Sequence, residues 1–85
     1  MKTVRYTTDA LKALRRYGTV AARIRQAVDD YAANSAAHAN NVTRLVGSAA
    51  SRMRVGDYRV SFVETDTELT VLRIGPRGSV YEEGR

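Results

Sequence analysis

The stretch "SRMRVGDYRVSF", residues 51–62, predicts a β-hairpin around Gly56-Asp57. If these two residues form the whole loop, Val55 faces Tyr58 and Arg54 faces Arg59 across the strand pair. Side chains alternate along a strand, so the hairpin has one apolar face and one basic face. The apolar face consists of Met53, Val55, Tyr58, Val60 and Phe62, and the basic face of Arg52, Arg54 and Arg59.

The crowding of three arginines on one face needs an explanation. Like charges directly opposite each other destabilise a strand pair by about 0.2–1 kcal/mol. A slip of one residue would relieve the repulsion only by turning the arginines into the core. The hairpin alone leaves two interpretations open. It is either a solvated face on which flexible side chains spread apart, or an anion site where guanidinium groups converge on phosphate.

The N-terminal half predicts a strand followed by two helices. Residues 2–6, "KTVRY", alternate as a short strand does. Residues 7–18 predict a helix capped by Thr7 or Thr8 and ended by Gly18. A second helix begins near Thr19, and its apolar stripe consists of Val20, Ile24, Ala27, Val28 and Tyr31. So short a connection predicts an antiparallel helical hairpin.

The C-terminal half predicts a sheet. Residues 34–41 have no periodicity and are expected to form a loop. Strands are expected at residues 43–46, 51–55, 58–64, 68–75 and, as a short stub, 79–81. The order β-α-α-β-β-β-β predicts an α+β fold, with a two-helix hairpin packed on a mostly antiparallel sheet. Residues 1–85 are expected to form one domain.

Composition narrows the function classes. The 85 residues include no cysteine, which excludes disulfides and Cys-ligated zinc. No stretch approaches the length of a membrane span, so the expected location is the cytoplasm, without a membrane partner. The formal charge is +5, and twelve of the fourteen basic residues are arginine. Arginine favours bidentate contacts with phosphate or carboxylate, so the partner is either a nucleic acid or an acidic protein.

Further basic residues follow the hairpin. Arg73 and Arg77 lie near the end of the next predicted strand, and Tyr81 comes shortly after them. An aromatic ring beside arginines can stack a base while the arginines hold the backbone. Arg44, on the preceding predicted strand, is assigned with Arg73 to RNA binding. Together these residues favour RNA as the ligand.

Two motifs resemble the RelE/ParE superfamily of bacterial toxins from type II toxin–antitoxin systems. The first is the hairpin "RMRVGDYRV", and the second is "VLRIGPR" followed closely by "VY". The β-α-α order and the length agree, so the resemblance covers nearly the whole chain. For RelE-like members it implies a ribosome-dependent endoribonuclease that cuts messenger RNA. It also implies a cognate antitoxin as partner and no metal or small-molecule cofactor.

The resemblance also implies catalytic roles. Arg52 and Arg54 stand where relatives often have a basic pair, commonly lysine. Arg59 matches the arginine that stabilises the scissile phosphate, Arg77 a later basic residue, and Tyr81 a tyrosine that orients the substrate. The implied reaction is attack of a ribose 2′-OH on its own 3′-phosphate.

The proton acceptor is left open. Arginine, with a pKa near ~13, is a poor base at neutral pH, and Pro76 stands where relatives often have histidine. Asp57 and Tyr81 are candidates, whereas His38, the only histidine, is not expected to be catalytic.

Two alternative functions also fit the sequence. A ParE-like toxin has the same fold and poisons DNA gyrase by binding it, without a nuclease site. A degenerate toxin or basic binding module would lack activity, which the missing base and Ser51, where relatives often carry an aromatic residue, would explain.

Overall fold

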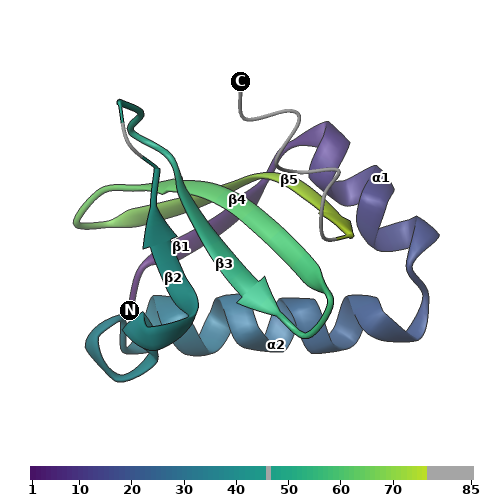
Figure 1. The fold of residues 1–85 in the computed structure, drawn as a ribbon, viewed down its shortest axis with the longest axis horizontal. Coiled ribbons are helices and arrows are strands. Elements are labelled where there is room, and N and C mark those ends of the chain that lie inside the picture. Colours follow the sequence, from purple (N-terminus) through teal and green to yellow (C-terminus); the bar gives the residue numbers. More distant parts are fainter. Residues whose placement is uncertain (46, 77–85) are drawn as a thin grey trace.

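The computed structural model describes residues 1–45 and 47–76. Two helices pack against a five-stranded sheet, with α2 running beneath it and α1 at one end (Figure 1). The helices are α1 (Thr8–Arg16), α2 (Thr19–Ala33) and the short 3-10 helix η1 (Ala36–Asn41). The strands are β1 (Thr3–Tyr6), β2 (Val42–Arg44), β3 (Ser51–Val55), β4 (Tyr58–Glu64) and β5 (Glu68–Pro76).

The sheet confirms the predicted α+β class. Its strand order is β1-β5-β4-β3-β2, with β1 parallel to β5 and every other pair antiparallel. The predicted hairpin register is confirmed, because Val55 pairs with Tyr58 and Arg54 with Arg59. Gly56 has a φ of +59° and Asp57 has no positive φ, a pattern typical of a type II′ turn.

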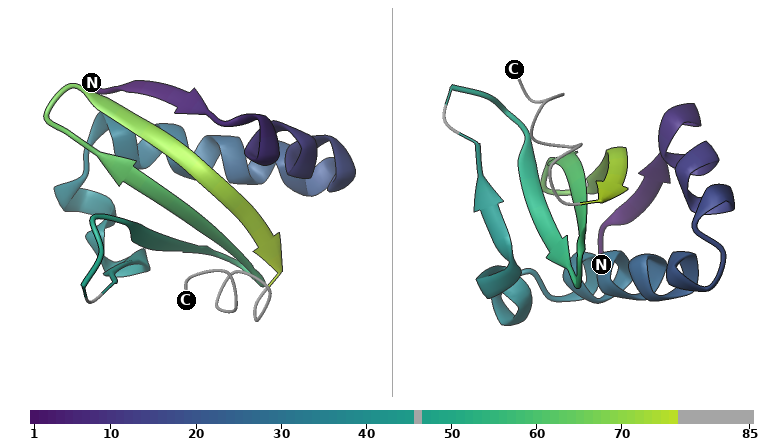
Figure 2. Two further views of the ribbon diagram at one scale, coloured as in Figure 1. Left: turned by 90° about the horizontal axis from the view of Figure 1, so that it is seen from above. Right: turned by 45° about the vertical axis from the view of Figure 1, so that its right-hand side comes forward.

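The helices bury their apolar stripes on the sheet rather than on each other. Thr7 caps α1 by accepting a hydrogen bond from the Ala10 amide at 3.2 Å. After Gly18 the chain turns into α2, whose axis is steeply inclined to that of α1 in Figure 1 and in the right-hand view of Figure 2. The predicted α2 stripe is confirmed, since Ile24, Val28 and Tyr31 are buried. No helix in residues 1–45 and 47–76 is long and apolar enough to cross a membrane.

The core lies between the helices and the predicted apolar face of the hairpin. Phe62 and Val60 are completely buried, and the Tyr31 ring packs edge-on against Phe62 with centroids 5.4 Å apart. At the other end of the core the Tyr17 and Tyr58 rings pack in the same way at 4.8 Å. The buried hydrophobic residues are Ala10, Leu14, Ile24, Val28, Tyr31, Ala32, Met53, Val55, Val60, Phe62, Leu69, Val71 and Ile74.

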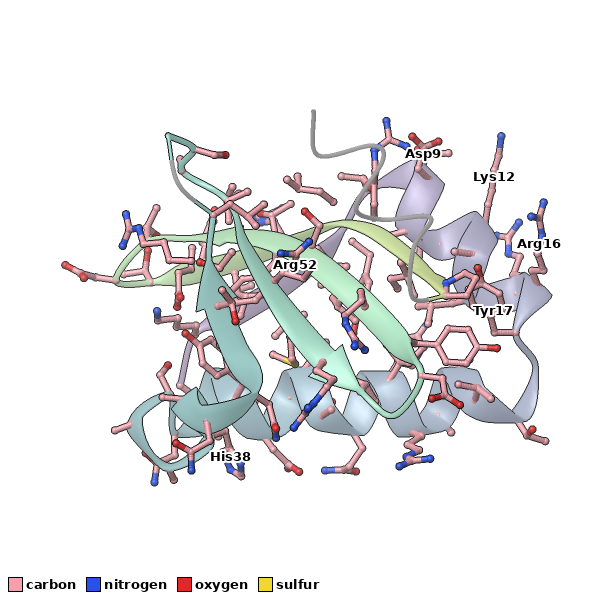
Figure 3. The ribbon with its side chains drawn as sticks, viewed as in Figure 1. Asp9, Lys12, Arg16, Tyr17, His38 and Arg52 are labelled. Atoms are coloured by element: carbon pink, nitrogen blue, oxygen red, sulfur yellow. The ribbon has the colours of Figure 1, made fainter. Side chains whose placement is uncertain are left out.

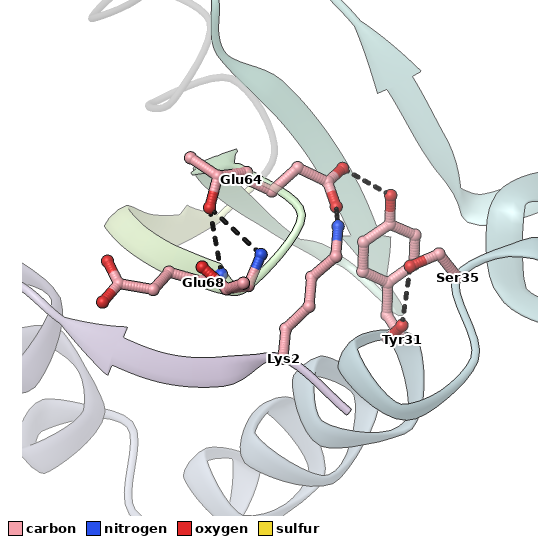
Figure 4. A network of polar contacts seen from close by, with 7 residues as sticks. Lys2, Tyr31, Ser35, Glu64 and Glu68 are labelled. Atoms are coloured by element: carbon pink, nitrogen blue, oxygen red, sulfur yellow. Dashed lines mark hydrogen bonds and ion pairs between the residues drawn. The ribbon is translucent and has the colours of Figure 1, made fainter.

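A polar network closes the core at the end opposite the hairpin turn (Figure 4). The Tyr31 hydroxyl donates to Glu64 at 2.6 Å, and Lys2 forms an ion pair with the same carboxylate. Burial raises the pKa of Tyr31 to about 12, helped by the hydrogen bond to Glu64. Burial alone would raise the pKa of Glu64, but the hydrogen bonds from Lys2 and Tyr31 outweigh it, and the net shift is downward.

Some expected elements differ in detail. Residues 34–41 are not an irregular loop throughout, because residues 36–41 form η1, where Ser35 O accepts from the His38 amide at 3.2 Å. The strand expected at 43–46 is β2, which ends at Arg44. The stub expected at 79–81 lies outside the described residues.

A β-bulge interrupts the pairing of β4 with β5. Ser61 pairs with Arg73, but its neighbour Phe62 pairs with Val71, so Leu72 is an extra residue. Strict alternation from Leu69 and Val71 would turn Arg73 into the core. The bulge buries Ile74 instead and places Arg73 on the outer face.

Candidate functional site

Two rows of paired residues cross the outer face of the sheet, which the helices do not cover. In the first row Thr43 pairs with Arg52, Arg52 with Ser61, and Ser61 with Arg73. In the second row Arg54 pairs with Arg59, and Arg59 with Gly75. Figure 3 shows Arg52 lying across the hairpin, on a different part of the surface from Lys12 and Arg16 of α1. The register therefore brings Arg52, Arg54 and Arg59 together, and we call these three residues the arginine cluster.

Hydrogen bonds hold Arg59 at the hairpin turn. Its Nη1 donates to the Gly56 carbonyl at 3.2 Å and to the Tyr58 carbonyl at 3.0 Å. These carbonyl oxygens bring partial negative charge to the guanidinium group and draw it toward the turn. Gly75, its partner on β5, adds no side chain on that side. The Arg59 guanidinium is thus oriented, while its Nε–H and Nη2–H groups make no hydrogen bond within residues 1–45 and 47–76 and can donate to an anion.

A cavity of about 280 Å³ adjoins the arginine cluster. It is lined by Asn40, Asn41, Thr43, Arg52, Arg54 and Arg59. All three arginines of the cluster line it together with amide and hydroxyl groups, and no carboxylate of the described chain does. Such a lining suits an anion.

A larger groove of about 820 Å³ lies between α2 and the hairpin turn, and Arg54 and Arg59 line it as well. It adds Arg23 from α2, whose guanidinium group lies beside Gly56, about 3.5 Å from where a Cβ would be. Asp57 and Asp30 also line this groove. The groove is therefore an open, mixed-charge surface that continues from the arginine cluster.

The two residues assigned to RNA binding lie in different places. Arg73 is on the outer face beside Ser61, and its Nη1 is 3.6 Å from Asp9 Oδ2 of α1. Arg44 pairs with Ser51, which places it on the opposite face of the sheet, where its charge helps to lower the pKa of Glu64. The structure therefore places Arg73 on the same face as the arginine cluster and Arg44 on the opposite face. Arg77 and Tyr81 lie outside the described residues.

Asp57, the candidate proton acceptor within the described residues, and His38, which is not expected to be catalytic, line different cavities. Asp57 lines the large groove together with Arg54 and Arg59. His38 lies on η1 at the far end of the molecule from α1 (Figure 3) and lines a third, smaller cavity next to Arg54. Within residues 1–45 and 47–76, no three His, Asp or Glu side chains gather as metal ligands would.

The sequence analysis missed several residues that line these cavities. Asn40, Asn41 and Thr43 line the cavity beside the arginine cluster, and Arg23 reaches the turn from α2. The pair of asparagines just before a predicted strand was the available signal. The contact of Arg23 depends on how α2 packs under the hairpin, which no local pattern encodes.

No protein-family model matches the chain, and no curated protein matches it by sequence. Solved structures, however, are similar over almost the whole chain. A chain of the archaeal RelE–RelB complex from Pyrococcus horikoshii OT3 matches with a TM-score of 0.75 and 25% identity, covering 92% of this chain and 97% of that one. A chain of the RelBE2 toxin–antitoxin complex from Mycobacterium tuberculosis matches with a TM-score of 0.60 and 27% identity, covering 89% and 98%. A chain of the E. coli DinJ–YafQ toxin–antitoxin complex matches with a TM-score of 0.69 and 18% identity, covering 94% and 97%.

These similarities confirm the fold and the resemblance found in the sequence. The chain is RelE-like: it has the fold of the RelE and YafQ toxins. They give no support to the ParE-like alternative.

Proposed function

We propose that this RelE-like chain is the toxin of a type II toxin–antitoxin system and a ribosome-dependent endoribonuclease that cuts messenger RNA. The observation that carries the proposal is the arginine cluster, in which Arg52, Arg54 and Arg59 share one sheet face and line one cavity. A face built only for solubility gains nothing from placing like charges directly opposite each other. A face that binds the phosphates of RNA does gain from it.

The proposed reaction needs positioning and charge stabilisation more than covalent chemistry. The ribose 2′-oxygen attacks the adjacent phosphorus and forms the O2′–P bond, while the P–O5′ bond breaks. The 2′-hydroxyl proton passes to a base and the 5′-oxygen gains a proton, giving a 2′,3′-cyclic phosphate and a 5′-hydroxyl. Arg59 stabilises the charge that develops on the phosphorane, and Arg52 and Arg54 hold the strand in line. In this proposal Arg77 and Tyr81 complete the site, and no metal or cofactor takes part.

Asp57 is our candidate for the proton acceptor. Of the candidates considered, it is the carboxylate that lines the same groove as Arg54 and Arg59. A carboxylate within reach of the 2′-hydroxyl can take its proton, which an arginine cannot do at neutral pH.

The proposed partners follow from charge and from the similar structures. The matched chain from P. horikoshii was solved in a complex with RelB, and the one from E. coli in a complex with DinJ. The matched chain from M. tuberculosis was solved as part of the RelBE2 complex. We infer a cognate antitoxin for this chain as well. Because the arginine cluster must be neutralised, we expect the antitoxin to present an acidic segment that orders on binding.

The test is cleavage of a defined messenger RNA on translating ribosomes, with the new 5′ and 3′ ends mapped. Wild-type protein should produce 2′,3′-cyclic phosphate ends, and should do so only when ribosomes are present. Arg59→Ala should cut about 10²–10³-fold more slowly, the usual loss when one transition-state donor is removed. Arg5→Ala is the matched control, because Arg5 is an exposed arginine that pairs with Glu68 away from the arginine cluster.

Intact message with wild-type protein would refute the nuclease. Equal cleavage by wild-type protein and a folded Arg59→Ala variant would instead refute the site. Circular dichroism of the variant verifies that it is folded.

A further inference from the structure

Three neighbouring cavities meet at Arg54 and Asn41, and both residues line all three. The smallest, about 200 Å³, lies between α2, η1 and β3. We call it the base pocket. It is lined by Ala27, Asp30, Tyr31, His38, Asn41, Met53 and Arg54. The reaction proposed above uses Arg54 but none of the other residues that line this pocket.

The strand register explains why Asn41 stands beside Arg54. Val42 pairs with Met53 in the antiparallel β2–β3 ladder, so the preceding residue, Asn41, is next to the residue after Met53. That residue is Arg54, and both side chains are exposed. Within residues 1–45 and 47–76, the Asn41 amide makes no side-chain hydrogen bond and Arg54 no ion pair. Both groups are therefore available to a ligand.

The base pocket is lined by planar side chains that can stack on a base and by polar groups that can bind the edge of that base. The His38 imidazole and the Arg54 guanidinium group are planar groups on which an unstacked base can lie. Ala27 and Met53 provide apolar contact. The Tyr31 hydroxyl is engaged with Glu64, so this residue contributes its ring alone.

Two polar groups can recognise the edge of a base. The Asn41 amide offers both a donor and an acceptor. Asp30 offers only acceptors, and one of its oxygens already accepts from Gln26 at 2.8 Å. The other oxygen is left to accept from an amino group. Adenine, guanine and cytosine can donate to Asp30 from an exocyclic amino group that projects from the ring, whereas uracil can donate only from N3–H, which lies between two carbonyl oxygens that a carboxylate repels.

We propose that the base pocket holds one base of single-stranded RNA while Arg54 binds its phosphate. Asp30 and Asn41 then select bases that carry an exocyclic amino group over uracil. This inference rests on the proposed function, because it assumes that RNA lies across the arginine cluster. It assigns η1 and α2 to substrate selection, a role separate from the chemistry on the hairpin.

Binding can be tested without ribosomes, because His38 is the only histidine and its imidazole gives a single set of NMR signals. The purified protein is titrated with AMP, GMP, CMP and UMP at constant pH, with inorganic phosphate as the reference anion. We expect the three amino-bearing nucleotides to shift the His38 signals more than phosphate does. UMP should bind about fivefold more weakly than they do, the effect of weakening one hydrogen bond by about 1 kcal/mol.

Matched variants separate base recognition from general anion binding. Asn41→Ala and Asp30→Asn should each reduce the difference between UMP and the other nucleotides. The controls are Asn40→Ala and Asp66→Asn, which should preserve that difference. Asn40 lines the cavity of about 280 Å³ but not the base pocket, and Asp66 lies in the β4–β5 turn. Equal shifts from nucleotides and phosphate, or equal affinity for UMP, would overturn the base pocket.

The nucleotide titration tests the base pocket and the ribosome assay tests the nuclease, and the two results are independent. If wild-type protein cuts message and Arg59→Ala does not, but no nucleotide shifts His38, the base pocket is wrong and the nuclease stands. If no message is cut, the nuclease is wrong, and the titration still decides whether the pocket binds a base.

Discussion

Arg54 and Arg59 lie directly opposite each other in the β3–β4 ladder, one residue from the Gly56-Asp57 turn on either side. Their repulsion is partly offset because Arg59 donates to the carbonyls of Gly56 and Tyr58. Arg54 has no such contact among the described residues and lines all three cavities. The pair thus gives up some stability of the hairpin and leaves one guanidinium group ready to bind an anion.

Arg54→Gln should therefore stabilise the free protein while weakening its activity. Removing one of two opposed charges should raise the free energy of unfolding by about 0.2–1 kcal/mol. Urea denaturation at low salt measures this gain, which should shrink as salt screens the wild-type repulsion. Messenger RNA cleavage by the same variant should fall. Arg5→Gln is the control and should show no gain, because it removes an exposed ion pair with Glu68. A clear loss of stability in Arg54→Gln would contradict the assigned repulsion.

The hairpin was predictable because its information is local. A two-residue loop with glycine fixes the register, and the register fixes which face carries Arg52, Arg54 and Arg59. The cavities were not predictable, because they depend on where η1 brings Asn41 and where α2 brings Arg23. The bulge left a weak signal, since the spacing of the buried residues in β5 changes from two, between Leu69 and Val71, to three before Ile74. Without pairing information, that change does not show which residue is extra.

Deleting Leu72 should be tolerated far better than deleting a regularly paired residue of β5. The deletion joins Val71 directly to Arg73, so regular alternation still leaves Val71 on the core face and Arg73 on the outer face. It removes the Leu72 carbonyl that accepts from Thr7 at 2.7 Å, so we expect it to cost about 1 kcal/mol of unfolding free energy. Deleting Thr70 instead keeps the extra residue and turns the start of β5 over, so it should cost more than about 3 kcal/mol or prevent folding. Thermal unfolding of the two variants makes the comparison, and similar melting temperatures would show that Leu72 is not the residue that the pairing can spare.

Gly56→Ala should loosen the hairpin turn. The φ of +59° at this position is unfavourable for a residue with a Cβ, by roughly 1–2 kcal/mol. The new methyl group would also contact the Arg23 guanidinium group at about 3.5 Å. Urea denaturation should show the loss, and amide hydrogen exchange should be faster in Val55 and Tyr58 than in wild-type protein. Asp57→Ala, at the loop position without a positive φ, serves as the control and should cost less. Equal losses in the two variants would argue against the backbone explanation.

Acid should destabilise the protein partly through Glu64. Because the pKa of Glu64 is lowered in the folded state, its contribution is fully present above its ordinary value near 4.5. That contribution is lost as the pH falls through the ordinary value and then through the folded value. Glu64→Gln should be less stable at neutral pH and should lose less on acidification below about pH 5. Glu68→Gln, which removes an exposed partner of Arg5, should keep the wild-type acid profile. Urea midpoints measured from pH 7 to pH 3 test this, and parallel profiles for wild type and Glu64→Gln would contradict it.

Alkali should destabilise the protein through Tyr31, whose hydroxyl donates a hydrogen bond to Glu64. The pKa of Tyr31 is raised to about 12, so its hydroxyl stays protonated in the folded state after it has ionised in the unfolded chain. The stabilisation is therefore complete below about pH 10 and is lost as the pH rises toward 12. Tyr31→Phe should cost about 1.5–3 kcal/mol at neutral pH, because it removes a hydrogen bond to a carboxylate. It should also weaken the alkaline decline, whereas Tyr17→Phe, whose ring packs on Tyr58, should keep it. Some decline should remain in Tyr31→Phe, since burial also raises the pKa of Tyr6. If the unfolding free energy of Tyr31→Phe fell as steeply as that of wild type between pH 9 and pH 11, the Tyr31–Glu64 bond would not be the cause.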